Sequence, residues 1–142
     1  MINNLDNFVK KLRNSGLRPT KQRIKICEVL FTPEKTFHFT INDLTKIIQE
    51  KQTEKISLAT VYNTVHAFKK KGYLKEISVA ADKSYFDTNV TEHHHFFDTK
   101  GNELIDIDPS QIELKNIPIP PKGKSIKDID VIIKVENDSH SL

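Results

Sequence analysis

The chain has 142 residues, of which 37% are hydrophobic and 29% are charged, so it is the size of one ordinary domain or two very small ones. A single cysteine, Cys27, excludes an internal disulfide, a zinc site built from paired cysteines and an iron–sulfur ligand set. No apolar run approaches the roughly 18 residues that a membrane span needs, and no signal peptide is recognisable, so we expect a soluble cytoplasmic protein without a membrane partner.

The net charge of +3 is distributed unevenly along the chain. Residues 1–90 hold 16 Lys and Arg against 9 Asp and Glu, whereas residues 91–142 hold 6 against 10. A basic first part favours a polyanionic partner such as DNA, although many proteins with this excess never bind nucleic acid. The contrast predicts two modules with different partners. A short polar stretch over 88–92 separates them, so we expect a domain over 1–88, a hinge linker over 89–92 and a second domain over 93–142.

Four amphipathic helices are predicted in the first part. The first helix ends before Gly16, and Thr20 is a suitable N-cap for the second, which runs to 31. Thr40 begins the third helix, with Asp43 as its capping-box partner three residues later. Ser57 caps the fourth helix, over 57–71.

The fourth helix is predicted to bury one face and to present a small, polar face to solvent. No acidic residue occurs from 57 to 73, and three lysines end the helix. Such a surface suits the major groove of DNA, although an ordinary solvated helix with a basic end would show the same pattern. The spacing predicts that the buried face carries Leu58, Val61, Val65 and Phe68, and that the exposed face carries Ala59, Thr60, Tyr62, Asn63, Thr64 and Ala67.

Two strand-like runs, 74–79 and 84–87, follow this helix and are separated by turn-forming residues. Three helices, a helix with a polar face and a β-hairpin occur in the order of a winged helix-turn-helix. The helix over 57–71 would then be the recognition helix and the hairpin the wing. Arg18, Lys21 and Arg23, at the start of the second helix, are suited to contact phosphates.

The second part is predicted to hold strands over 93–98, 103–107 and 129–135, with a short helix over 111–114. About fifty residues with few apolar anchors make a poor independent core. Pairing with a second copy of the chain, along the strand over 129–135, would supply the missing contacts.

Three consecutive histidines, His93, His94 and His95, begin this second part. On a strand, His93 and His95 point to one side and His94 to the other, which suits ligation of a divalent metal or of haem. A solvated polar loop would also be consistent with the run. His38, between two phenylalanines, is by itself more typical of a packed residue than of a ligand.

Enzymatic interpretations find little support in the sequence. The chain has four glycines and no glycine-rich phosphate loop, and it has neither a serine elbow nor a His-Glu-x-x-His helix. A metallohydrolase using the histidines would need a general base, and none is placed beside them. A metal storage protein or metal chaperone, which would not recognise a DNA sequence, is a further alternative.

Several motifs carry a family resemblance over about residues 5–135. The segments 16–23 (GLRPTKQR) and 57–64 (SLATVYNT), together with the histidine run, resemble the ferric uptake regulator (Fur) family. The segment 83–90 (KSYFDTNV) before the histidines is most similar to the iron response regulator (Irr) branch. The resemblance implies an α+β fold, with an N-terminal winged helix-turn-helix followed by a small α/β dimerisation domain.

The implied function is that of a homodimeric transcription factor, not an enzyme, which binds a double-stranded DNA operator and controls iron and haem homeostasis. Tyr62 matches the base-contacting tyrosine of the family, whereas Asn63 stands where many relatives carry arginine. The helix face and the resemblance together predict DNA contacts from Arg18, Lys21, Arg23, Ser57, Ala59, Thr60, Tyr62, Asn63 and Lys70.

The resemblance also implies a hinge site for iron, manganese or zinc, and haem as an effector held by His93, His94 and His95. The chain lacks the paired cysteines of a structural zinc site and the Cys-Pro pair of a haem motif. Phe96 and Phe97 stand where an acid and a histidine are usual, which speaks against the family's second metal site. By motif position, the hinge ligands are His38, Asp87, His93, His95 and Asp106.

Overall fold

The computed structural model describes residues 4–51 and 55–139, so the predicted domain ends at 1–3 and 140–142 lie outside the described residues. The chain forms two compact units, residues 1–90 and residues 91–142. Within the described part of the chain, every helix is too short or too polar to cross a membrane.

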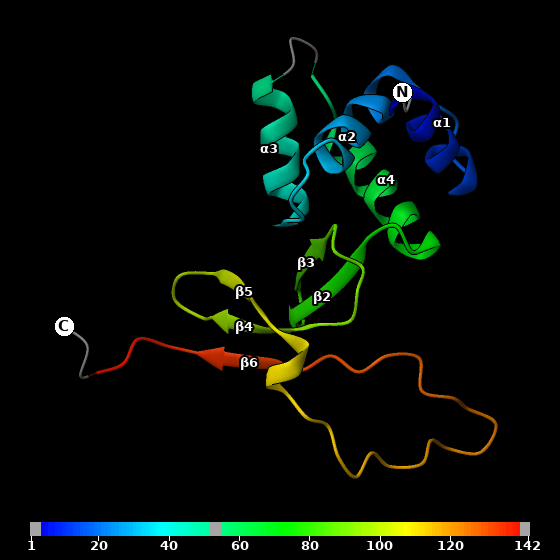
Figure 1. Cartoon of the computed structure of the whole chain (residues 1–142). Coiled ribbons are helices and arrows are strands. Elements are labelled where there is room, and N and C mark those ends of the chain that lie inside the picture. Colours follow the sequence, from blue (N-terminus) through cyan, green and yellow to red (C-terminus); the bar gives the residue numbers. More distant parts are fainter. Residues whose placement is uncertain (1–3, 52–54, 140–142) are drawn as a thin grey trace. The chain divides into compact units, whose positions relative to one another are not determined.

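The first unit begins with a group of helices (Figure 1). Their caps follow the predicted chemistry: the Thr20 hydroxyl accepts from the Arg23 N–H at 3.2 Å, and Thr40 and Asp43 bond each other's backbone N–H reciprocally. The helices are α1 (Asn4–Asn14), α2 (Lys21–Phe31), α3 (Ile41–Lys51) and α4 (Leu58–Lys71).

Helix α4 begins at a Ser57 N-cap and ends at Gly72, whose φ of +95° is the left-handed conformation that favours glycine at a helix end. Val61, Val65 and Phe68 are buried as predicted. The assignment of Leu58 to the core was wrong, because this first helical residue lies at the end of the buried stripe and is 52% exposed.

Thr64 was wrongly predicted to be exposed. It is fully buried, and its hydroxyl donates to the Thr60 carbonyl at 2.7 Å. Because its polar group is satisfied within the helix, the side chain can face the core at no cost in unpaired hydrogen bonds.

A small antiparallel sheet completes the first unit, in the order β1–β3–β2. Strand β2 (Lys75–Ala80) and strand β3 (Lys83–Asp87) form the predicted hairpin. Strand β1 (His38–Phe39) was not predicted, because two residues are too short to show a strand period. The order of helices and hairpin is that of a winged helix, and the predicted α+β class is confirmed.

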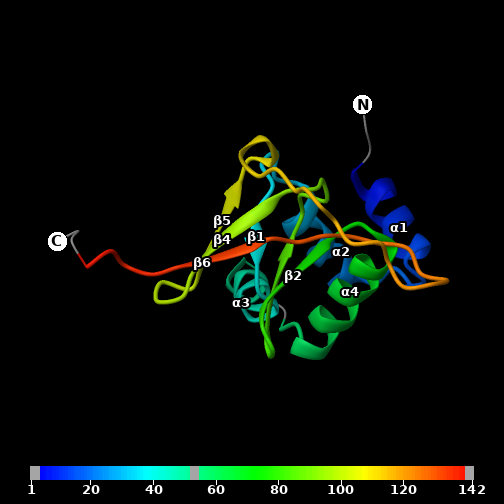
Figure 2. The ribbon, with the colours of Figure 1, turned by 90° about the horizontal axis from the view of Figure 1, so that it is seen from below.

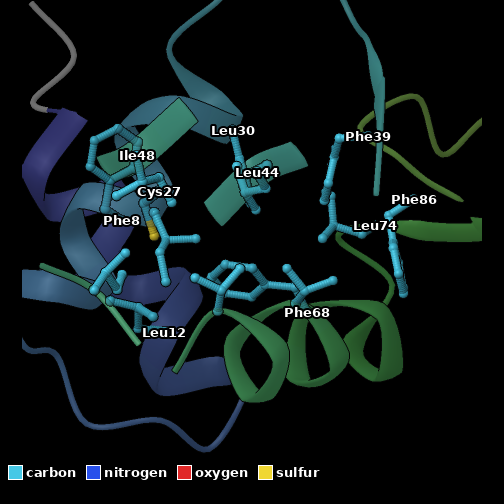
Figure 3. Packing of buried hydrophobic residues seen from close by; sticks show 14 residues of the cluster. Phe8, Leu12, Cys27, Leu30, Phe39, Leu44, Ile48, Phe68, Leu74 and Phe86 are labelled. Atoms are coloured by element: carbon cyan, nitrogen blue, oxygen red, sulfur yellow. The ribbon is translucent and has the colours of Figure 1, made fainter. Parts of the chain in front are cut away.

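One hydrophobic cluster holds the helices and the sheet of this unit together (Figure 3). Phe68 of α4 is fully buried and meets Phe31 of α2 edge-on, with ring centroids 5.5 Å apart. Phe86 of β3 stacks on Phe39 of β1 at 5.9 Å. The cluster therefore fixes the buried face of α4 and leaves its other face available to solvent.

The second unit is a three-stranded sheet in the order β5–β4–β6, with β4 antiparallel to β5 and parallel to β6. Figure 2 shows the long loop, coloured yellow to orange, that leads from the one-turn helix η1 (Pro109–Gln111) to β6. The strands are β4 (His94–Asp98), β5 (Glu103–Ile107) and β6 (Ile132–Val135).

Two predictions for this unit need correction. The helix predicted over 111–114 was wrong: the only turn of helix there is η1, since the Asp108 carboxylate accepts from the Ser110 N–H at 2.9 Å and Pro109 starts the turn. The last strand begins at Ile132 and not at residue 129.

Candidate nucleic-acid interface and metal centre

The face of α4 away from the core is small and polar, as predicted. Tyr62 is 52% exposed, and Ala59, Asn63 and Lys70 are also exposed. The first turn contains no acid and the last turn holds three lysines. Since Tyr62 and Asn63 face solvent and not the interior, this helix can approach a duplex without unfolding.

Ser57 and Thr60, also predicted to contact DNA, serve the helix cap. The Ser57 hydroxyl accepts from the Thr60 N–H at 3.1 Å, and the two hydroxyls lie 2.8 Å apart. These groups are already hydrogen-bonded within the protein, so they offer less to a base edge than Tyr62 and Asn63 do.

The predicted phosphate contacts lie around the start of α2. Lys21 is exposed in the first turn, whereas the Arg23 guanidinium donates to the Arg18 carbonyl at 2.8 Å. The Gln22 side chain donates to the Lys55 carbonyl at 3.3 Å. This bond ties the start of α2 to the segment that leads into α4.

The wing is fastened to the end of α4 by an ion pair. Lys69 Nζ lies 3.0 Å from Glu76 Oε1 on β2. Burial by itself raises the pKa of Glu76, but the hydrogen bonds from Ser84 and Lys69 and the positive charges of Lys69 and His66 outweigh it. The pKa of Glu76 therefore lies below its usual value, and the carboxylate stays charged at neutral pH.

His66 was not predicted to contribute to this surface, yet its ring contacts Tyr62. The two ring centroids lie 4.1 Å apart, which is close aromatic packing for an exposed side chain. The i, i+4 spacing on a helix was the available signal.

Two of the predicted metal ligands meet in the first unit. His38 Nε2 lies 3.4 Å from Asp87 Oδ2, because the two residues are partners in the register of β1 and β3. Asp87 is fully buried, and its other oxygen accepts from the Asn89 N–H at 2.8 Å. The pair presents an imidazole and a carboxylate, a donor set that suits a divalent transition metal.

Three further predicted ligands converge in the second unit. His93 Nε2 and His95 Nε2 lie 3.3 and 3.1 Å from the same oxygen, Asp106 Oδ1. His95 meets Asp106 because the β4–β5 register pairs them, and His93 directly precedes β4, two residues before His95. His95 is 2% exposed, whereas the Asp106 side chain is 48% exposed.

A hydrogen bond of His93 shows why a cation fits this group. Its Nδ1 lies 2.7 Å from the Thr91 carbonyl, which can only accept, so Nδ1 carries a proton. In neutral His93, Nε2 would then aim a lone pair at the carboxylate of Asp106. A metal ion between these atoms would compensate this repulsion, and Nδ1 bonded to a carbonyl is the usual support of a metal-ligating histidine.

His94 is directed to the other side of β4. Its Nδ1 accepts from the Val131 N–H at 3.1 Å and so ties β4 to the residue before β6. The structure therefore does not bring His94 together with His93 and His95, although all three were predicted to hold haem.

Comparisons with known proteins agree with this architecture. The sequence matches the model of the Ferric uptake regulator family over residues 14–134. The peroxide-responsive repressor PerR of Staphylococcus epidermidis is 28% identical over 127 residues, which cover 89% of this chain and 80% of that repressor.

Two solved structures share the fold. The ferric uptake regulator of Pseudomonas aeruginosa with manganese has a TM-score of 0.66 at 23% identity, over 92% of this chain and 97% of that one. The ferric uptake regulator of Francisella tularensis with iron has a TM-score of 0.70 at 19% identity, over 87% of this chain and 94% of that one. Because the family match extends from the end of α1 into β6, the chain belongs to the Ferric uptake regulator family of metal-responsive, DNA-binding transcriptional regulators.

Proposed function

We propose that the chain acts as a homodimeric repressor that binds a specific DNA operator and whose affinity for it depends on a bound divalent metal. The observation that carries this proposal is the acid-free outer face of α4, on which Tyr62 and Asn63 are exposed ahead of a basic last turn. In a member of this family, that face is the candidate recognition surface.

Each exposed side chain of the surface has a distinct role in the proposal. Tyr62 and Asn63 contact base edges, and the small side chain of Ala59 permits close approach to the groove. Arg18, Lys21 and Lys70 neutralise phosphates, and so does the part of the Arg23 guanidinium not bonded to Arg18. The base contacts would confer specificity, while the phosphate contacts would supply affinity for any duplex.

The metal would be held by imidazole and carboxylate groups. His38 and Asp87 offer donors in the first unit, and His93, His95 and Asp106 in the second. The assignment of all five to one hinge metal rests on the family resemblance. The metal supplies positive charge to these donors, and iron, manganese and zinc all accept nitrogen and oxygen ligands of this kind.

Dimerisation is supported by the apolar surface of the small second unit. Ile105 of β5 and Ile133 of β6 are large side chains that stay exposed, as is Ile119 in the long loop. A second copy of the chain would bury such residues and enlarge a core that is small for independent stability.

The finer assignment to the Irr branch, with haem as the effector, rests on the motif over 83–90 and on the histidine run. The rings of His93 and His95 are 4.4 Å apart, which leaves no space for a macrocycle between them. Haem bound to this unit would therefore use one of these two histidines on a given face, or His94 on the other side of the strand.

Selection of bound fragments from random duplexes, with metal, with haem and with neither, tests the proposal directly. We expect one enriched motif with two half-sites, dependent on metal. Enrichment without any motif would contradict the proposal and favour a metal storage or chaperone protein. Turnover of a hydrolysable substrate, abolished by Asp87→Ala, would favour a metallohydrolase.

Two variants then distinguish base-specific contacts from electrostatic contacts with the phosphates. Tyr62→Ala should cost about 1–3 kcal/mol of discrimination at particular base pairs. Lys70→Ala should weaken binding to all sequences alike and flatten the salt dependence by up to about one unit. Equal loss on specific and random duplexes in both variants would contradict a recognition role for α4.

A further inference from the structure

We propose that His66 is a positioning residue, which holds the ring of Tyr62 in the orientation that α4 presents to DNA. The inference rests on the proposed function for the role of Tyr62. The two residues are four apart on α4, and their ring centroids lie 4.1 Å apart with planes inclined by 41°. Neighbours at this spacing lie on the same helix face, so the His66 ring contacts the exposed Tyr62 ring directly.

His66 is itself held in place by the wing. Its ring meets Phe86 of β3 edge-on, at 5.4 Å and 82°. Phe86 is buried and stacks on Phe39 of β1, its partner in the strand register. Tyr62, His66, Phe86 and Phe39 thus form a continuous series of ring contacts from the exposed face of α4 into the core.

This series distinguishes Tyr62 from an ordinary exposed tyrosine. A free aromatic side chain on a helix surface exchanges between rotamers and loses that freedom when it binds. The His66 ring restricts this exchange before DNA arrives, so less entropy is lost on binding. The same contact would fix which base pair the Tyr62 ring meets, and so contribute to specificity as well as to affinity.

The expected effect follows from the usual cost of immobilising one side chain. His66→Ala should weaken binding to the selected operator about three- to tenfold and leave affinity for a random duplex unchanged. His66→Phe keeps a ring at this position and should restore operator affinity to within about twofold. Equal weakening by both variants, or equal weakening on both duplexes, would overturn the proposal.

A double-mutant cycle shows whether His66 acts through Tyr62. In a Tyr62→Ala background, His66→Ala should cause no further loss of operator affinity, because the side chain that it positions is gone. Full additivity of the two losses would overturn the proposal.

Nuclear magnetic resonance of the DNA-free protein gives a readout that a merely structural role would not move. The Hα–Hβ coupling constants of Tyr62, which report exchange between its χ1 rotamers, should become more averaged in His66→Ala, while those of Tyr85, buried on β3, stay unchanged. Unchanged Tyr62 couplings would overturn the proposal whatever the DNA result. If Tyr62→Ala retains sequence discrimination, the proposed base contact fails, while the couplings still decide whether His66 positions the ring.

Discussion

His38 of the two-residue strand β1 lies directly opposite Asp87 of β3, and 3.4 Å separates His38 Nε2 from Asp87 Oδ2. The adjacent pair in the same ladder is Phe39 with Phe86, whose rings stack. One short strand therefore carries both a candidate metal ligand and the base of the ring series that reaches Tyr62. Loss of β1 pairing would disturb both.

Asp87→Asn should reduce metal affinity by at least about tenfold, because it replaces a charged ligand by a neutral one of the same size. The measurement is the rise in melting temperature that Mn²⁺, Fe²⁺ or Zn²⁺ causes in anaerobic calorimetry, since a ligand that binds the folded state stabilises it. Asp82→Asn, in the exposed turn between β2 and β3, is the matched control and should keep the full rise. An undiminished rise in Asp87→Asn would remove Asp87 from the metal site.

Substitutions of the neighbouring residues His94 and His95 should affect different properties of the protein. His95→Ala should lower metal affinity, because the Nε2 atoms of His93 and His95 both lie close to the Asp106 carboxylate. His94→Ala should leave metal affinity intact but accelerate hydrogen exchange at the Val131 amide, whose acceptor it removes. A metal titration and an exchange experiment on both variants check this, and a reversed outcome would contradict the alternation along β4.

The Lys69–Glu76 ion pair should make stability depend on pH in the acid range. Because the pKa of Glu76 is lowered in the folded state, its carboxylate stabilises the fold above its unfolded pKa of about 4.3, and this contribution is lost as pH falls through the lower folded value. Glu76→Gln should therefore be less stable than wild type at pH 7, with the difference shrinking towards pH 3. Urea unfolding at a series of pH values measures it, and a difference that does not vary with pH would show that charge is not the cause.

Cys27 should resist thiol reagents in the native protein. Burial raises its pKa to about 12, with a smaller opposing effect of the Lys11 charge, and the side chain, on α2, is fully buried in the hydrophobic cluster. Since the thiolate is the reactive form, labelling at pH 8 should follow opening of the core and accelerate in denaturant. Rapid labelling without denaturant would contradict the packing in Figure 3.

The two ends of the predicted apolar stripe of α4 should respond differently to truncation. Phe68→Ala should cost about 3–5 kcal/mol of unfolding free energy, because it removes a fully buried ring. Leu58→Ala should change stability by less than about 0.5 kcal/mol, since this side chain is exposed. Denaturant unfolding of both variants is the measurement, and a large loss for Leu58→Ala would mean that this residue is covered in solution.

The sequence by itself determined the features that short-range chemistry controls. The starts of three helices could be predicted from their capping residues, Thr20, Ser57 and the Thr40–Asp43 pair, because a cap satisfies N–H groups only a few residues away. Helical periodicity likewise placed Tyr62 and Asn63 on the outer face of α4.

Only the tertiary structure decided which distant residues meet. Strand β1 exists because β3 pairs with it, and the contact of His38 with Asp87 is a consequence of that register. Periodicity could not separate exposed Leu58 from buried Thr64, because burial depends on what the neighbouring elements cover. The His66 contact with Phe86 likewise required the wing to return beside α4, since contacts between segments far apart in the chain are set by packing and not by local propensity.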